Sequence, residues 1–275
     1  MSKRFDDVLI ISDMDGTLLP LGGKVSAENK AAIRNFCENG GHFAVATGRI
    51  PSATAPYLTG VDINAPSIFY NGAMLYDFGG QKILATEPLQ KNAADTEFWY
   101  DFAKNILSNM PKACVEVYTA EGCFIVSPGE NDDPRLAKEH YDSAHRDLES
   151  LKEQPWLKFF ICDEHERLEK MRIAAEKMGA MERANSFYSE RNYYEFVAQN
   201  VSKGSMLKKL RSLIGNDKLK IIAAGDYLND NEMLREADIG VASANAHAET
   251  KKAADVVGCR VEEHLIKWIL ENVIK

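Results

Sequence analysis

Short runs of consecutive apolar residues, each followed by a polar or glycine-containing turn, recur near both ends of the chain. A run that is apolar at every position predicts a strand buried on both faces, as in a parallel sheet. Helical patterns lie between these runs and predict right-handed strand–helix–strand units in a doubly wound, mostly parallel α/β sheet. The runs, apolar except for Ser12, Ser67 and Lys220 at their ends, span residues 8–12, 43–46, 67–70, 220–224 and 239–242. The helical patterns span 26–39, 203–214 and 261–274.

The middle of the chain has a different pattern. A helical segment over residues 92–110 is followed by a predicted hairpin made of 114–118 and 123–126. A predicted strand at 158–162 and a predicted helix at 164–178 follow, so helices and strands again alternate over short distances. This antiparallel α+β pattern predicts a separate domain at residues 83–189, inserted into a core domain formed by residues 1–82 and 190–275.

Composition narrows the class of protein. The chain has 275 residues, of which 45% are hydrophobic and 27% charged, which is a globular balance and excludes a disordered or coiled-coil chain. Lysine and arginine number 33 against 41 acidic residues, giving a net charge of −8, and no basic run interrupts this background. We therefore expect no nucleic-acid partner. No apolar stretch approaches the roughly 18 residues of a membrane span, so we expect no membrane partner.

The five cysteines indicate the compartment. Their number is odd, they are widely spaced, and no two form a CxxC pair. The apolar run at residues 8–11 is too short for the core of a signal peptide. We therefore expect a cytoplasmic protein with reduced thiols. The sequence carries no signal for the oligomeric state.

Polar side chains follow the predicted strands at the point where each strand ends. They are Asp13 and Asp15, Thr47, Asn71, and Asp226 and Asp230. The carboxyl ends of parallel strands meet at one edge of a sheet, where ligands bind. Lys203 opens a predicted helix, and its long side chain could reach the same crevice. Carboxylates, one lysine and small polar groups suit a hard divalent cation together with a phosphate.

These residue types allow a specific chemistry. Asp13 and Asp226 could supply carboxylate ligands to Mg²⁺, and the backbone carbonyl of Asp15 a third ligand. Thr47, Lys203 and the amides of the turn at 15–17 could hold phosphate oxygens. Asp13 could then attack phosphorus and form an aspartyl-phosphate. Because crowding raises the pKa of one member of a carboxylate group, we expect Asp15 to carry the proton for the leaving oxygen and then to act as base toward water.

Taken singly, these motifs are weak evidence, because a lone DxD pair is more often a solvated turn or a helix cap. Their order along the chain is more specific. A DxDGT at 13–17, a TGR at 47–49, a lysine and a GDxxND at 225–230 follow successive apolar strands.

At these residues the chain resembles the haloacid dehalogenase superfamily of phosphatases, over nearly its full length. Segments 13–19, 47–49, 201–204 and 225–230 look like the four motifs of that family. The position of the insertion, after the second motif and Asn71-Gly72-Ala73, is similar to the Cof-type branch, which has a C2B cap. The resemblance implies a Rossmann-like core with an inserted α+β cap domain.

The resemblance also implies roles, position by position. Asp13 would be the nucleophile and Asp15 the acid/base. The Mg²⁺ site would use Asp13, the Asp15 carbonyl and Asp226, with Asp230 supporting or ligating. The phosphate would be held by the Met14 backbone, Thr47, Gly48, Lys203 and Asn229, with Arg49 and Asn71 at the edge of the site.

The resulting prediction is a Mg²⁺-dependent phosphatase of small phosphomonoesters, such as sugar phosphates or similar metabolites. One alternative is a sugar phosphomutase on the same scaffold, which shares the aspartyl-phosphate. Another is a Mg²⁺-binding module whose phosphorylated aspartate serves signalling. Asp15 argues against the signalling module, because an adjacent acid/base speeds turnover of the intermediate. Sugar phosphates, nucleotides and phosphorylated cofactors all remain open as substrates.

Overall fold

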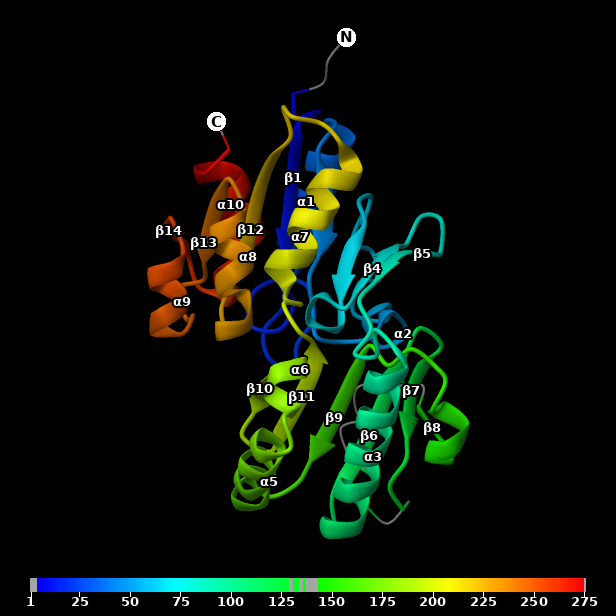
Figure 1. Cartoon of the computed structure of the whole chain (residues 1–275). Helices are drawn as coiled ribbons and strands as arrows, with labels where there is room; N and C mark the ends of the chain where they lie inside the picture. Colours follow the sequence, from blue (N-terminus) through cyan, green and yellow to red (C-terminus); the bar gives the residue numbers. More distant parts are fainter. Residues whose placement is uncertain (1–3, 129–130, 134–135, 137–142, 275) are drawn as a thin grey trace. The chain divides into compact units, whose positions relative to one another are not determined.

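A computed structural model of the chain describes residues 4–128, 131–133, 136 and 143–274. The chain divides into two compact units (Figure 1): residues 1–85 with 202–275 form the first, and residues 86–201 the second. The sequence pattern placed the return to the first unit at residue 190, whereas the structure has it at Ser202. The reason is β11, Tyr193–Ala198, which pairs with strands of the second unit on both sides.

The first unit contains a five-stranded parallel sheet in the order β14-β13-β12-β1-β2. β1 lies in the middle of the sheet and pairs with β12 and β2, which explains why its apolar residues occupy both faces. The strands are β1 (Val8–Ser12), β2 (His42–Val45), β12 (Lys220–Gly225), β13 (Ile239–Ala242) and β14 (Val256–Val257).

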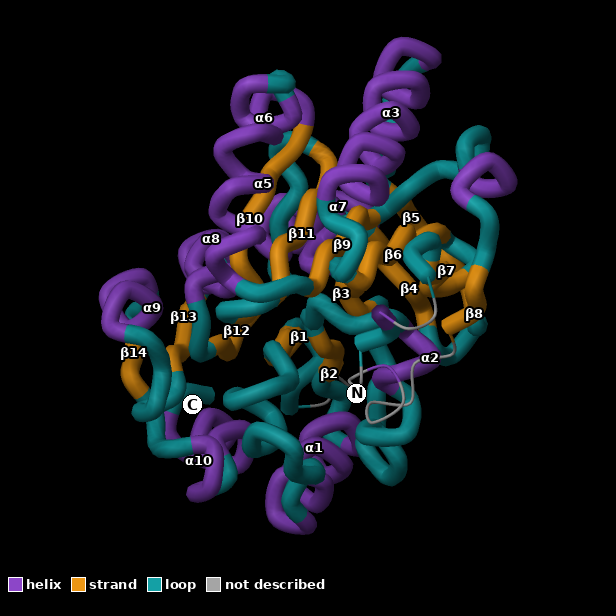
Figure 2. Tube along the Cα trace, turned by 90° about the horizontal axis from the view of Figure 1, so that it is seen from below, coloured by secondary structure: helices purple, strands orange, loops and turns teal. Residues whose placement is uncertain are grey.

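Helices cover both faces of this sheet. Figure 2 shows α1 and α10 on one face and α7 and α8 on the other. Leu9 and Ile11 of β1 belong to a buried cluster with Met206 and Leu207 of α7. The arrangement confirms the predicted doubly wound, mostly parallel sheet. The helices of this unit are α1 (Ala27–Glu38), α2 (Pro51–Thr54), α7 (Lys203–Ile214), α8 (Asn231–Glu236), α9 (Ala248–Ala253) and α10 (Leu265–Asn272), with single 3₁₀ turns at Tyr70–Gly72, Leu228–Asp230 and Val261–Glu263.

The apolar run at residues 67–70 was expected to be a strand of the parallel sheet, but it belongs to a separate small sheet. β3, Ser67–Phe69, pairs antiparallel with β4, Met74–Asp77, and these two form a small sheet with β5, Lys82–Thr86. A single parallel bridge between Ala46 and Ile68 still connects β3 to the chain just after β2. The sharp turn after β3 is therefore held beside the end of the parallel sheet.

The second unit is the α+β insertion expected from the sequence. Its six-stranded sheet has the order β10-β11-β9-β6-β7-β8 and is antiparallel except for the β7–β8 pair. Aromatic residues of α3, among them Trp99 and Phe102, pack with Phe159 and Phe196 of the sheet. The aromatics at residues 98–102 thus build core rather than a binding surface. The elements are α3 (Ala93–Asn109), β6 (Cys114–Thr119), β7 (Gly122–Ile125), β8 (Ser143–His145), a 3₁₀ turn (Leu148–Leu151), β9 (Lys158–Cys162), α5 (His165–Lys177), α6 (Ala180–Arg183), β10 (Ala184–Glu190) and β11.

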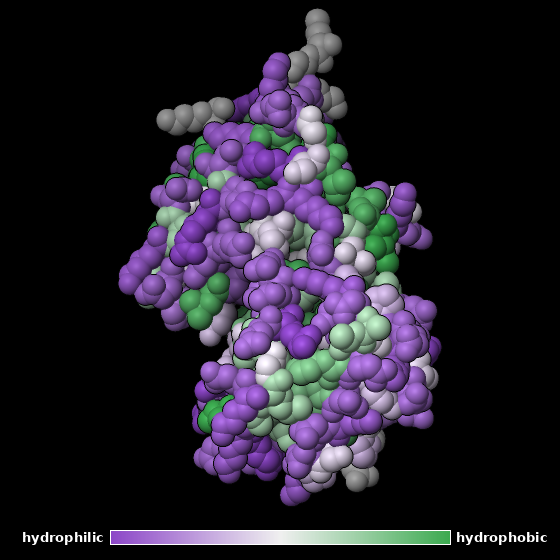
Figure 3. All heavy atoms as spheres, in the orientation of Figure 1, coloured by the Kyte–Doolittle hydropathy of each residue, from purple (hydrophilic) through white to green (hydrophobic). Residues whose placement is uncertain are grey.

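The surface agrees with the composition. On the face drawn in Figure 3 most exposed residues are hydrophilic. Among the described residues, no helix combines the length and apolarity that a membrane crossing requires. All five cysteines are free thiols.

Candidate active site

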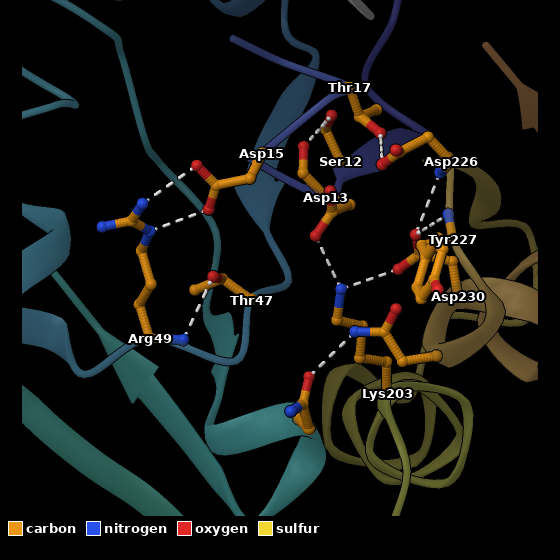
Figure 4. A network of polar contacts seen from close by, with 12 residues as sticks. Ser12, Asp13, Asp15, Thr17, Thr47, Arg49, Lys203, Asp226, Tyr227 and Asp230 are labelled. Carbon is orange, nitrogen blue, oxygen red and sulfur yellow. Dashed lines mark hydrogen bonds and ion pairs between the residues drawn. The ribbon is translucent and has the colours of Figure 1, made fainter. Parts of the chain in front are cut away.

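The turn that follows β1 carries the two aspartates of the first motif. Asp13 is anchored at the strand end, where its backbone N–H donates to the Ala224 carbonyl at 2.9 Å. Gly16 has a φ of +88°, and a Cβ at this position would lie 2.4 Å from Asp226 Oδ2. Only glycine therefore lets the turn pass this close to the loop after β12. Figure 4 shows Asp13 and Thr17 of the turn and Asp226 and Asp230 of the loop gathered in one cluster.

Lys203 enters this cluster from the first position of α7. Ser202 caps the helix, accepting a hydrogen bond from the Ser205 backbone, which fixes where the helix begins. Gly72 has a φ of +110°, and a Cβ there would meet the Ser202 carbonyl at 2.1 Å, so the start of α7 packs directly on the turn after β3. The Lys203 ammonium donates to Asp13 Oδ1 at 2.6 Å and to Asp230 Oδ1 at 2.7 Å, with its side chain fully buried.

The two acidic residues after β12 have different surroundings. Asp226 accepts a hydrogen bond from the Thr17 hydroxyl at 2.9 Å. Asp230 accepts from the backbone N–H groups of Asp226 and Tyr227 at 3.0 and 3.1 Å through its second oxygen. Both oxygens of Asp230 thus have protein partners, and this residue shapes the loop as well as holding Lys203.

Three carboxylates and one ammonium make the cluster strongly acidic. Asp13, Asp226 and Asp230 each present an oxygen within 4.8 Å of the others. Burial raises the pKa of Asp13 well above its ordinary value against the opposing effect of Lys203, and Asp230 and Asp226 raise it further. Burial, followed by the charge of Asp230, raises the pKa of Asp226 to about 6. Burial alone would lower the pKa of Lys203, but its two carboxylate partners outweigh burial and raise that pKa.

Asp15 lies apart from this carboxylate cluster, as Figure 4 shows. Its two oxygens accept from Arg49 Nε at 2.8 Å and Nη2 at 3.0 Å. We expected neighbouring carboxylates around Asp15. In the structure the crowded carboxylates are Asp13 and Asp226 instead. Thr47, at the end of β2, accepts from the Arg49 backbone N–H at 3.2 Å.

Of the remaining predicted residues, Asn71, Gly48 and Asn229 lie near one another at the turn after β3. Asn229 donates through its side-chain amide to Asn71 Oδ1 at 3.1 Å. A Cβ on Gly48 would lie 2.8 Å from the Asn71 amide nitrogen, so these two residues are in close approach. Met14 is fully buried, and its carbonyl accepts from the backbone of residues 17–19, which closes the turn.

Two residues of the site were not singled out in the sequence. Thr17 holds Asp226 through its hydroxyl, and its place in the DxDGT run was the available signal. The Tyr57 ring lies 4.8 Å below the Arg49 guanidinium. No sequence signal identifies this contact, because Tyr57 sits in a turn beyond α2.

The chain is similar to known proteins in both sequence and structure. A family model described as haloacid dehalogenase-like hydrolase matches residues 10–269. The chain is 26% identical to phosphatase YwpJ of Bacillus subtilis, over 97% of this chain and 99% of that protein. It is 27% identical to 5-amino-6-(5-phospho-D-ribitylamino)uracil phosphatase YcsE of the same organism, over 98% of this chain and all of that protein. The crystal structure of TM0651 from Thermotoga maritima superposes with a TM-score of 0.83 at 24% identity, covering 96% of each chain.

Proposed function

The chain belongs to the haloacid dehalogenase-like hydrolase family, and we propose that it is a Mg²⁺-dependent phosphatase of small phosphomonoesters that works through an aspartyl-phosphate on Asp13. The observation that carries this proposal is the cluster of buried Asp13, Asp230 and Lys203 with half-buried Asp226 at the carboxyl ends of β1 and β12. In the same proposal the inserted unit, residues 86–201, is the cap domain.

The donor set fits a divalent cation. Three carboxylates share the cluster with one ammonium, so the ionised side chains leave an excess of negative charge in a buried place. Hard oxygen donors are the ligands that Mg²⁺ prefers. Asp13, the Asp15 carbonyl and Asp226 would hold the ion, with Asp230 supporting them through Lys203 and the loop backbone. When bound, Mg²⁺ would neutralise charge on the phosphoryl oxygens and favour the ionised carboxylates.

In the first half of the reaction, the Asp13 carboxylate attacks phosphorus. The bond between phosphorus and the ester oxygen breaks, and that oxygen takes a proton from Asp15. Lys203 is held 2.6 Å from Asp13 and supplies positive charge beside the transferring group. Thr47, Asn229 and the turn amides near Met14 and Gly48 would bind the phosphoryl oxygens.

In the second half, Asp15 is a carboxylate and takes a proton from water. That water attacks phosphorus, releases inorganic phosphate and restores Asp13. Asp15 suits this exchange because its side chain is partly exposed and lies outside the carboxylate cluster, so Asp15 and Asp13 keep separate tasks.

The proposed substrates are small phosphorylated metabolites. The relative YcsE is named for a phosphorylated ribityl compound, which supports a polyhydroxylated leaving group. The site described above recognises the phosphate end, which such metabolites have in common.

The test is phosphate release by the purified full chain from p-nitrophenyl phosphate and a panel of phosphomonoesters, with Mg²⁺ and with EDTA. We expect turnover that needs Mg²⁺ and that Asp13→Asn abolishes without unfolding the protein. Asp62→Asn is the matched control, because Asp62 is an exposed carboxylate paired with Arg34 on α1. Absence of phosphate release across the panel, or full activity in Asp13→Asn, would contradict the proposal, and an isomerised sugar phosphate without free phosphate would indicate a mutase.

A further inference from the structure

Arg49 and Asp15 form a two-pronged ion pair beside the carboxylate cluster. Arg49 Nε and Nη2 each donate to a different oxygen of the Asp15 carboxylate, at 2.8 and 3.0 Å. The Arg49 side chain is 12% exposed and that of Asp15 is 30% exposed, so the guanidinium is largely shielded from water while the carboxylate stays partly accessible. Two parallel hydrogen bonds to a planar guanidinium fix the plane of a carboxylate as well as its position.

Arg49 is itself fixed by the segment that follows β2. Its backbone N–H donates to the Thr47 hydroxyl oxygen at 3.2 Å. Its guanidinium lies over the ring of Tyr57, with 4.8 Å between Cζ and the ring centroid. A cation stacked on an aromatic face loses further freedom. Thr47 and Tyr57 thus restrict the position of Arg49, and Arg49 in turn contacts both oxygens of Asp15.

We propose that Arg49 is the positioning residue for Asp15. The two N–H donors of its guanidinium hold the acid/base carboxylate in one orientation, and the Tyr57 ring supports the guanidinium. The inference rests on the function proposed above, because it assumes that Asp15 transfers the proton. Arg49 acts through Asp15 and is not assigned a contact with the phosphate.

The proposal has a consequence that a purely structural ion pair does not have. Proton donation matters most when the leaving oxygen is strongly basic, and least when it departs as a stable anion. Phenyl phosphate and p-nitrophenyl phosphate have nearly the same shape, but phenolate is the more basic leaving group. Loss of Asp15 positioning should therefore lower kcat/KM, which reports the first half of the reaction, much more for phenyl phosphate than for p-nitrophenyl phosphate.

The experiment compares Arg49→Lys and Arg49→Met with Asp15→Asn, using both substrates. We expect Arg49→Met to lower kcat/KM on phenyl phosphate by about 100-fold and on p-nitrophenyl phosphate by about tenfold or less, with no rise in KM. Lysine keeps the positive charge but lacks the planar pair of N–H donors. Arg49→Lys should therefore show the same substrate dependence in weaker form. Arg34→Lys is the matched control, because Arg34, which lies on α1, makes an exposed ion pair with Asp62, and it should leave both rates unchanged.

A double variant separates action through Asp15 from direct action. If Arg49 works only by positioning Asp15, adding Arg49→Met to Asp15→Asn causes no further loss on either substrate. Additive losses, a raised KM, or an equal loss of kcat/KM on both substrates would overturn the inference and indicate that Arg49 binds the phosphate directly. Failure of the proposed function would look different, since wild type would then release no phosphate or Asp13→Asn would remain active.

Discussion

Replacing Lys203 by methionine removes the only ammonium that contacts the carboxylate cluster among the described residues. The side chain is fully buried and pairs with Asp13 and Asp230 at 2.6 and 2.7 Å. Methionine has a similar length, so the main change is electrostatic. Removing one partner of a buried ion pair typically costs about 3–5 kcal/mol, because the remaining charge stays buried without compensation.

Here two carboxylates lose their partner while Asp226 remains close by, so we place the loss for Lys203→Met in the upper part of that range, about 4–5 kcal/mol in EDTA. Mg²⁺ should recover part of the loss, because a cation that binds only the folded state stabilises it. Native-state hydrogen exchange at the amides of β1 and β12 reports the free energy of opening of the first unit alone.

Lys208→Met is the matched control on the same helix. Lys208 pairs with Glu236 at 3.0 Å but is 61% exposed, and exposed pairs contribute about 0–1 kcal/mol. Equal losses for the two variants, or a loss for Lys203→Met that Mg²⁺ does not reduce, would refute the reasoning that the cluster is a charge-balanced cation site.

Three further predictions concern the same site. Asp226→Asn should weaken Mg²⁺ binding in titration calorimetry while the fold persists, and unchanged affinity would remove Asp226 from the ligand set. Thr17→Val should weaken Mg²⁺ binding by about fivefold, since one hydrogen bond to Asp226 contributes about 1 kcal/mol, and an unchanged Kd would show that the hydroxyl does not orient the carboxylate. Mg²⁺ affinity should fall as the pH drops through about 6, the raised pKa of Asp226, because the proton must leave before the ion binds; a flat affinity across this range would contradict the assignment.

The parallel core could be predicted because its signals are local. β1 is apolar from Val8 to Ile11 since strands flank it on both sides and helices cover both faces, and that pattern is visible in these four consecutive residues. The helix at Lys203–Ile214 has its predicted bounds, since Ser202 caps its start and Gly215, at a φ of +62°, ends it. Side chains at strand ends then meet for topological reasons, which brings Lys203 to Asp13 across 190 positions of the chain.

Other features depend on partners that no local pattern reveals. β11 lies in the second unit because β9 and β10 pair with it, although its apolar residues also fit the returning core. Arg49 reaches Asp15 across 34 positions, from a loop whose course is set by Thr47 and the turn after β3. The sequence therefore pointed to the carboxylates but not to which of them are crowded.

The most direct test of the account is whether Asp13 carries the phosphoryl group during turnover. Asp15→Asn should slow hydrolysis of the intermediate, and p-nitrophenyl phosphate lets the first step proceed without a proton from that residue. After rapid acid quench of this variant with Mg²⁺ present, mass spectrometry of the peptide containing Asp13 should find one phosphoryl group on that side chain. Continued release of p-nitrophenolate with no protein-bound phosphoryl group, or with the group on another residue, would contradict the central claim.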